Sequence, residues 1–558
     1  MSTRSLWLPL ILLTPAACQT QSADLVVLDA VVYTANNAQP TAEGVAVTAG
    51  KVVFVGSSAD AQAYVGDDTE VIHLGGQALF PGFVDSHAHL SGVGSREQTL
   101  NLEGSLSIET LLARLKERVD LAAPGEWVTG RGWIETHWVP RRFPTRQDLD
   151  LVSPHNPVIL GRSDGHAAVA NSAALRIAGI TRETQPPAGG DILKDASGEP
   201  TGMLIDAARG LVGQHVPDVT EAELERAIEV GAEREVRYGW TQVQDAGGSW
   251  REVARMRKLY GEGRIQLRIY KTVNGPSESA DSLLAHGASV DEFNGLFTHR
   301  TIKVVMDGAL GSRGALLLKP YSDAPETHGL LTTNLDRLRP MMVEALRKGI
   351  QVEAHAIGDS ANRLLLDLIE EAQAAVPVSE RAIAEPRWRD EHTQIVDPAD
   401  LPRFKQLGVI PSMQASHAIG DLHFAPSRLG DDRLVGGYAW QTLLGDGNRI
   451  AGGSDAPVER GEPLIEFYAS VARRDTTGFQ GPNWRPEEAM TRDQALKSLT
   501  IWPAYAAFEE DRRGSIEVGK WADFTVFSAD IMTIPEDQIL KARNVMTLIN
   551  GKVVYREE

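Results

Sequence analysis

Short apolar runs that each end in a chemically capable side chain recur along the chain, and their spacing constrains the fold more than any other feature. Runs of strand length end at or near His87, Lys303, His355, His392 and Asp455. The intervals from 303 to 355, 392 and 455 each leave room for a helix and a loop. Such an alternation predicts parallel strands joined by helices. We therefore expect an α/β fold, a (β/α)8 TIM barrel, in which side chains at the C-terminal strand ends converge on one face.

His87-Ala88-His89 closes the first of these runs. Residues two apart in a strand point to the same face, so two imidazoles separated by a small residue can hold one cation from one side. By itself the pattern arises readily by chance in a chain with 14 histidines. The candidate ligands at the later strand ends support the interpretation of this pair as part of a metal site.

The order and context of these runs resemble the metal-dependent amidohydrolase superfamily. The residues that carry this resemblance are 80–89, Lys303, His355, His392 and 453–458. Further short motifs resemble those of the N-substituted formamide deformylases, a branch of amidohydrolase family 3. These motifs lie at residues 130–133, 164–171, 307–313 and 355–359. The resemblance extends from about residue 24 to the C-terminus.

The resemblance implies a site for two divalent metal ions. His87, His89 and Asp455 would bind one ion, and His355 with His392 would bind the second. Nitrogen and carboxylate ligands of this mixture suit zinc, with manganese, iron, cobalt or nickel as alternatives.

Lys303 is the unusual member of the set, because a protonated amine beside two cations is strongly disfavoured. The resemblance implies that Lys303 reacts with carbon dioxide to form a carbamate, whose two oxygens would bridge two Zn²⁺ ions. The alternative is a lysine that reaches solvent from a strand end or pairs with a carboxylate such as Asp307.

A water shared by two cations has a pKa near neutrality and supplies hydroxide at ordinary pH. Asp455 would be both a metal ligand and the general base that takes the water's proton and passes it to the leaving nitrogen. Its alternative role is a helix N-cap, since Ser454-Asp455 precede Ala456-Pro457. His166, Arg313 and His417 are candidates for substrate binding, with loop caps for the histidines and an ion pair for Arg313 as alternatives.

These residues predict a hydrolase that cleaves a C–N bond in an N-acyl or N-formyl compound. A cyclic amide hydrolase or a deaminase would use nearly the same site, and an ester or lactone hydrolase needs the same hydroxide. A catalytically inactive binding or regulatory lipoprotein with this fold would be expected to lack ligands, and all six candidates are present.

Two domains and one insertion are predicted. Residues 24–78 and 501–558 are rich in short β-branched runs and would form the β-sandwich that the resemblance implies from both ends of the chain. Residues 79–500 would form the barrel, with an insertion at about 100–230 over its mouth. We count about ten candidate strands between 79 and 455, two more than a barrel takes, so some belong to the insertion.

Residues 1–18 are typical of a signal peptide. The apolar stretch at 6–13 is too short to span a bilayer. Small residues precede Cys18, the only cysteine, as in a bacterial lipoprotein processing site, and ordinary cleavage nearby is the alternative. The sequence thus predicts an exported protein, periplasmic or anchored to the outer membrane through a lipid on Cys18.

The charge of the chain limits its partners. With 55 basic and 75 acidic residues, the net charge of −20 opposes binding to nucleic acid or anionic lipid. We therefore expect a small-molecule substrate and membrane contact only through the N-terminal lipid, and an oligomer is compatible with the sequence.

Overall fold

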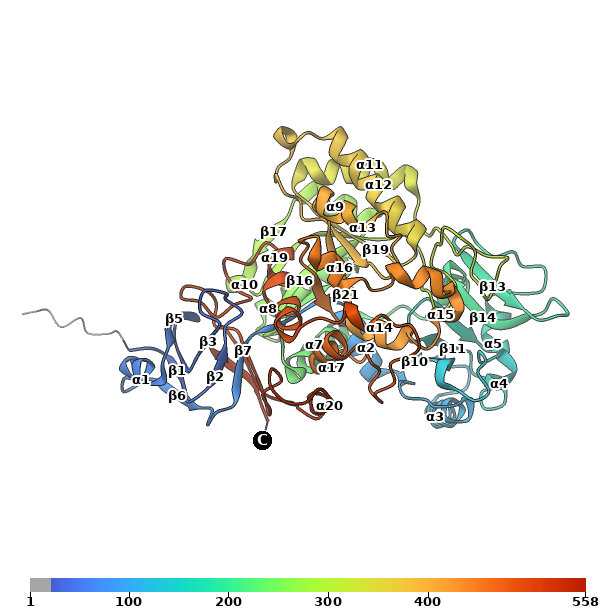
Figure 1. Cartoon of the computed structure of the whole chain (residues 1–558). Helices are drawn as coiled ribbons and strands as arrows, with labels where there is room; N and C mark the ends of the chain where they lie inside the picture. The colour runs from blue at the N-terminus through green and yellow to red at the C-terminus, as the bar shows by residue number, and fades with distance from the viewer. Residues whose placement is uncertain (1–21, 558) are drawn as a thin grey trace, which may run out of the picture.

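The computed structural model describes residues 22–557. The predicted signal peptide at 1–18 and Cys18 lie outside these residues, so export and lipidation stay predictions. In the described range, no helix combines the length and apolar character needed to cross a membrane. Figure 1 shows a β-rich body at one end, a central barrel with its helices, and a smaller lobe at the other end.

The central barrel confirms the predicted fold class. Its parallel strands are hydrogen-bonded to one another in chain order. They are β8 (Phe83–Ala88), β15 (Trp240–Asp245), β16 (Arg268–Asn274), β18 (Phe297–Val305), β19 (Gln351–Ala356), β20 (Arg389–His392), β21 (Ile410–Gln414) and β22 (Ala451–Gly453). The first and last strands meet where the Asp455 N–H donates to the His87 carbonyl over 2.6 Å.

Helices between the strands cover the outside of the barrel. They include α7 (Glu221–Tyr238), α8 (Trp250–Gly261), α9 (Glu278–His286), α11 (Leu335–Lys348) and α12 (Asp359–Ala375), and α17 (Pro463–Ala472) follows the last strand. In α7, Thr220 and Glu223 form a capping box at the start, and Gly239 ends the helix with a φ of 107°. Leu224 and Ile228, four residues apart, are buried on the same face.

The smaller lobe is a mixed sheet inserted into the first strand-to-strand connection, between α2 (Leu90–Gln98) and α7. Its strand order is β13-β14-β12-β11-β10-β9. These strands are β9 (Leu100–Asn101), β10 (Val128–Trp133), β11 (Val158–Arg162), β12 (Ala167–Ala170), β13 (Gly190–Lys194) and β14 (Pro200–Asp206). The lobe has its own apolar core around Trp133, Leu160 and Val169. The strand candidates in excess of a barrel lie here.

Strands from both ends of the chain share one sheet of the β-rich body. Its order is β25-β24-β23-β7-β2-β3, with β2 (Val31–Tyr33), β3 (Thr41–Ala42), β7 (Ala78–Pro81), β23 (Phe524–Phe527), β24 (Asn544–Ile549) and β25 (Lys552–Arg556). The facing sheet is β5-β4-β1-β6, formed by β5 (Lys51–Gly56), β4 (Gly44–Thr48), β1 (Leu25–Leu28) and β6 (Glu70–His73). An apolar cluster lies between the sheets.

The boundaries of this body differ from the predicted ones. β7 continues to Pro81 because it pairs with both β2 and β23. At the other end, the first sandwich strand begins at Phe524 rather than near residue 501. Residues 501–506 form helix α19, which follows the barrel helices directly. The strands of the sandwich lie within the two predicted ranges, apart from β7. The pairing of β7 sets the N-terminal boundary between the sandwich and the barrel.

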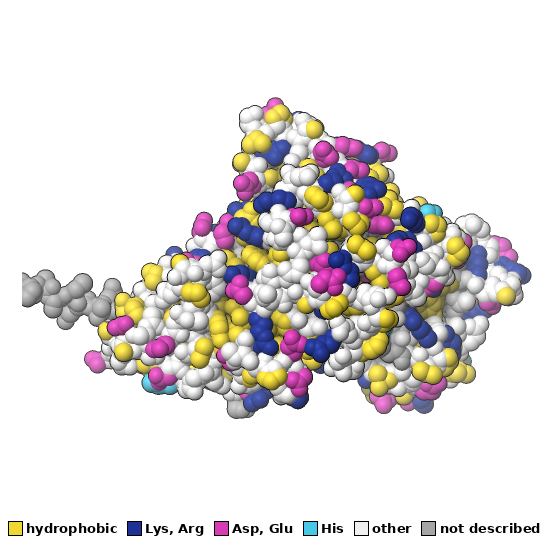
Figure 2. Space-filling model, in the orientation of Figure 1, with side chains coloured by type: hydrophobic (Ala, Val, Ile, Leu, Met, Phe, Trp, Pro, Cys, Tyr) yellow, Lys and Arg dark blue, Asp and Glu magenta, His cyan; other side chains and the backbone are white. Residues whose placement is uncertain are grey.

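Acidic and basic side chains are interspersed over the face shown in Figure 2, without a broad field of one sign.

Candidate metal centre

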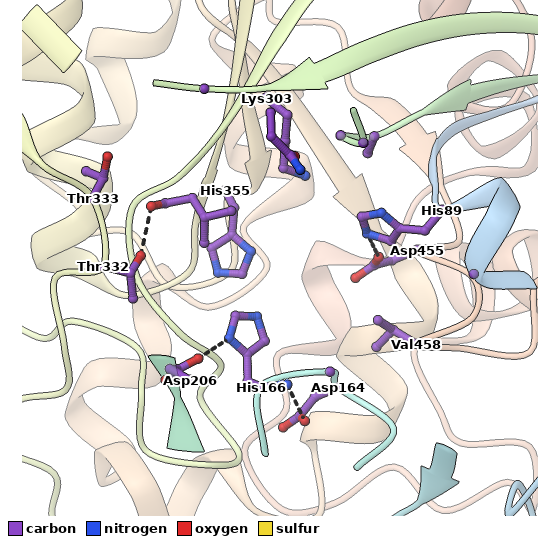
Figure 3. A pocket seen from close by; sticks show the side chains of 18 of the residues that line it. His89, Asp164, His166, Asp206, Lys303, Thr332, Thr333, His355, Asp455 and Val458 are labelled. Atoms are coloured by element: carbon purple, nitrogen blue, oxygen red, sulfur yellow. Dashed lines mark hydrogen bonds and ion pairs between the residues drawn. The ribbon is translucent and has the colours of Figure 1, made fainter. Parts of the chain in front are cut away.

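A cavity of about 770 Å³ opens at the C-terminal ends of the barrel strands. Barrel side chains form one part of its wall, and the inserted lobe contributes residues from β10, β14 and the loop at 163–166. Figure 3 shows the barrel residues His89, Lys303, His355 and Asp455 facing His166 of the lobe across this space. The lobe thus narrows the barrel mouth.

Three of the predicted ligands form the centre of the site. One side-chain ligand atom from each of His87, His392 and Asp455 lies within 4.8 Å of the others. The ring of His392 is 4.9 Å from that of His87 and 4.5 Å from that of His355, measured between centroids. The C-terminal ends of β8, β19, β20 and β22 therefore place three imidazoles and one carboxylate around a common point.

His89 and Lys303 complete the predicted set. His89 Nε2 lies 3.1 Å from Asp455 Oδ1, and Lys303 Nζ lies 3.0 Å from His87 Nε2. Lys303 is buried, so it does not reach solvent from its strand. It does not pair with Asp307 either, because that carboxylate accepts backbone N–H bonds from Leu316, Ile357 and Gly358.

Two residues that sequence reasoning missed orient the imidazoles. His87 Nδ1 is hydrogen-bonded to Glu391, which leaves His87 Nε2 facing the centre. His392 Nδ1 donates to Gln414 Oε1 over 2.7 Å in the same way. Partners of this kind fix the tautomer and ring orientation of metal-binding histidines. The signal for Glu391 in the sequence is the run of charged residues at 389–391 directly before His392, which the structure buries as β20. Gln414 ends the next strand, β21, and has no comparable signal.

Charge around Glu391 keeps it ionised. Burial opposes ionisation, but the guanidinium of Arg389, 2.7 Å away, and His87 lower the pKa of Glu391 to about 2. Burial, followed by the charge of Lys303, lowers the pKa of His87 to about 4. The pKa values of His355 and His392 also lie well below the usual range, first because of burial. Neutral imidazole is the form that binds metal ions.

The donor set therefore fits a divalent cation. His355 Nε2 is buried and makes no hydrogen bond within the described range of the chain. A buried nitrogen of this kind carries an unfavourable desolvation free energy unless something binds it. Together with the neighbouring imidazoles and the Asp455 carboxylate, it offers the nitrogen and oxygen ligands that zinc and similar metals take.

Asp455 is not a helix N-cap. It follows β22 with a φ of 58°, and the next helix, α17, begins only at Pro463. Burial raises the pKa of Asp455, but His89 and His87 outweigh it and hold that pKa well below the usual range. The preceding Ser454 donates to Asp85, which ties β22 to β8.

Of the three predicted substrate-binding residues, His166 lines the main cavity, and His417 lines a smaller cavity next to it. His166 Nδ1 is 2.6 Å from Asp206 Oδ1, and its ring is 5.0 Å from that of His355. His417 Nε2 lies 3.5 Å from Asp455 Oδ2. Arg313 lies outside the cavity lining and pairs with Asp323 at 2.9 Å, so the ion-pair alternative describes its environment.

A smaller cavity of about 70 Å³ adjoins the main one and shares His166, His355 and Asp455 with it. Ile134, Leu310 and Phe424 make part of its wall apolar. The site thus combines a polar chamber with a narrow, partly apolar recess next to the same imidazoles.

A barrel with histidines, a lysine and an aspartate at its C-terminal strand ends defines the class of metal-dependent barrel hydrolases. A comparison of the sequence with known families supports this class, because the sequence model of the amidohydrolase family matches residues 70–555. The chain belongs to the amidohydrolase family.

Individual relatives support the assignment. The chain is 34% identical to YtcJ of Bacillus subtilis, over 89% of this chain and 92% of that protein. It is 28% identical to the N-substituted formamide deformylase of Arthrobacter pascens, over 96% of this chain and 99% of the deformylase. A crystal structure of a metal-dependent hydrolase from Pyrococcus horikoshii superposes with a TM-score of 0.74 and 26% identity, covering 92% of this chain and 99% of that one.

Proposed function

We propose that this protein hydrolyses a C–N bond in an N-acyl or N-formyl compound, with divalent metal ions held at the barrel mouth. The observation that carries the proposal is the convergence of His87, His392 and Asp455 within 4.8 Å, next to the His355 ring, whose buried Nε2 makes no hydrogen bond in the described chain and lies 3.5 Å from Asp307 Oδ1. Similarity to a formamide deformylase over almost the whole chain supports the choice of bond.

In this proposal the ligands are His87, His89, Lys303, His355, His392 and Asp455, and the cations are two Zn²⁺. Carboxylation of Lys303 would explain why a lysine is buried among imidazoles, since the carbamate turns a cation into an anionic bridge. Cations bound there supply a hydroxide nucleophile at neutral pH and polarise the substrate carbonyl.

Asp455 carries the proton in the proposed reaction. The attacking oxygen bonds to the carbonyl carbon while the Asp455 carboxylate accepts its proton. The C–N bond then breaks, and Asp455 returns this proton to the leaving nitrogen, so the products are a carboxylate and an amine. The His166 ring, fixed by Asp206, projects into the cavity towards His355 and closes the space around the carbonyl (Figure 3).

The first test is metal content by elemental analysis, on protein lacking residues 1–18 and expressed with zinc and bicarbonate. We expect about two metal ions per chain for the wild type and a clear loss in Lys303→Ala. Lys116→Ala is the control, because Lys116 lies on the surface and pairs with Asp120. Release of formate or acetate from N-formyl and N-acyl amines should fall with the metal content.

Other outcomes separate the alternatives. One metal ion per chain, unchanged by Lys303→Ala, would contradict the bridging role and favour a deaminase. Faster turnover of esters or lactones than of matched amides would identify an ester hydrolase. Protein that binds no metal under any supply would be a binding protein with this fold.

A further inference from the structure

The acidic and basic groups of the main cavity are unevenly paired. Every carboxylate in its lining has a cationic or imidazole partner, in these pairs: Asp164–Arg162, Asp206–His166, Asp245–Lys271, Glu252–Lys271 and Asp455–His89. Three arginines, Arg131, Arg209 and Arg337, also line the cavity, and none of them has a carboxylate within 4 Å among residues 22–557. Arg337 is exposed to solvent at the start of α11, whereas Arg131 and Arg209 are partly buried. In a protein of net charge −20, two such guanidinium groups in one cavity call for an anion.

The fold holds Arg131 in place. It lies in β10 between Gly130 and Gly132, where a Cβ atom would come within 2.7 Å of the Leu100 carbonyl and 2.8 Å of the Glu103 nitrogen, respectively. Only glycine permits this close pairing of β10 with β9. The side chain between these glycines is therefore directed by the strand and not by a flexible loop.

Hydrogen bonds link Arg131 to the segment that carries Asp455. Arg131 Nη2 donates to the Ser163 carbonyl over 2.9 Å. Ser163 Oγ in turn donates to the carbonyl of Val458, three residues after Asp455, over 2.6 Å. Arg131 Nε is buried and has no hydrogen-bond partner in the described chain. The guanidinium is thus fixed beside the proposed reaction centre with donor capacity left over.

Arg209 approaches the same part of the cavity from another element. It ends the short helix η3 (Ala207–Arg209), directly after β14, and its Nε donates to the Asp206 carbonyl over 3.2 Å. Burial and then the nearby charge of Arg209 lower the pKa of Arg131, against the carboxylates of Asp455 and Asp164. The two cations are close enough to repel each other, which an anion bound between them would relieve.

We propose that Arg131 and Arg209 bind a carboxylate on the substrate, and that the substrate class is N-acyl or N-formyl amino acids. The inference rests on the proposed function for the bond that is cleaved. Guanidinium groups match a carboxylate through paired N–H donors. An amino acid places its carboxylate one carbon from the scissile nitrogen, and the small recess lined by Ile134, Leu310 and Phe424 suits an apolar side chain.

The test compares N-formylleucine with N-formylleucinamide, in both enantiomeric forms, by formate release from the zinc-loaded enzyme. The two probes have nearly the same size and differ in the negative charge. We expect kcat/KM for the acid to exceed that for the amide by about tenfold or more, the effect of a charge-assisted hydrogen bond. Arg131→Gln and Arg209→Gln should each lower this acid-to-amide ratio by about tenfold.

Two further variants separate binding from folding. Arg131→Lys keeps the charge and should retain part of the ratio. Arg339→Gln is the matched control, because Arg339 lies on the surface of α11 and pairs with Glu371 instead of lining the cavity. A ratio near one in the wild type, or equal losses for both probes in the arginine variants, would overturn the inference.

A binding measurement distinguishes this inference from the proposed function. We expect Asp455→Asn to slow turnover, because the proposed proton carrier is lost, and calorimetry on that variant then gives the Kd of each probe directly. Preferential binding of the acid that is lost on adding Arg131→Gln would support the anion site even if the wild type cleaved neither probe. Cleavage of both probes with no preference in rate or affinity would keep the hydrolase and reject the anion site.

Discussion

At the scale of single residues, the side chains that would bind metal could be predicted, and those that orient them could not. His87 follows an apolar run and His392 ends the short strand 389–392, and the barrel geometry gives such strand ends a common face. Glu391 and Gln414 matter because of their distance from a particular ring nitrogen, which depends on how neighbouring strands are staggered. No spacing in the sequence encodes that stagger.

Gln414 provides a test of this orienting role without a change in charge. Gln414→Met keeps the volume but removes the acceptor of His392 Nδ1–H. Because the partner fixes the ring, we expect zinc affinity to fall by about 10–100-fold. Competition with a chelator measures it, and Gln373→Met, which loses only a contact to the Leu407 carbonyl, should leave it unchanged. Equal affinities in the two variants would contradict the role.

At the scale of elements, the strand positions followed from the sequence, whereas the boundary of the sandwich did not. β7 reads as part of the apolar run leading to His87, and its pairing with β23, more than 400 residues away, assigns it to the sandwich. Non-local pairing of this kind has no local signal. The insertion was located because it adds strands that a barrel cannot accommodate.

The packing of α2 on α7 gives a prediction at this scale, since α2 begins at Leu90, directly after His89. A Cβ atom on Gly94 would lie 1.7 Å from the Ala227 carbonyl oxygen of α7. Gly94→Ala must therefore separate the helices, and we expect a loss of about 1–3 kcal/mol or more in the free energy of unfolding together with weaker metal binding.

Gly261→Ala is the matched control, because a Cβ atom at this helical position meets nothing within 4 Å. Removal of the glycine should stabilise the protein by about 0.4–1 kcal/mol. Urea unfolding measures both variants. If Gly94→Ala were as stable as the wild type with its zinc affinity intact, α2 would not position His89.

At the scale of the whole molecule, the sandwich and the barrel are joined by a buried ion pair. Arg268 of β16 holds both oxygens of Asp523, just before β23, at 2.6 and 2.9 Å, and both side chains are buried. Arg513 lies 4.0 Å from the same carboxylate. Composition could not reveal this link, because it depends on the ends of two strands in different domains.

Asp523→Asn leaves two guanidinium groups buried with reduced compensation, so we expect the free energy of unfolding to fall by about 3–5 kcal/mol. Burial raises the pKa of Asp523, but Arg268 outweighs it and the pKa lies below its usual value. The stability from ionisation is therefore complete above the unfolded-state pKa and is lost as the pH falls through the folded-state pKa. The deficit of Asp523→Asn relative to wild type should accordingly shrink in acid.

Urea unfolding from pH 7 to 3 measures this deficit. The surface variant Glu371→Gln is the control, and we expect its free energy of unfolding to stay within about 1 kcal/mol of the wild-type value. A deficit that stays constant over this range would show that packing, rather than the charge of Asp523, joins the two domains.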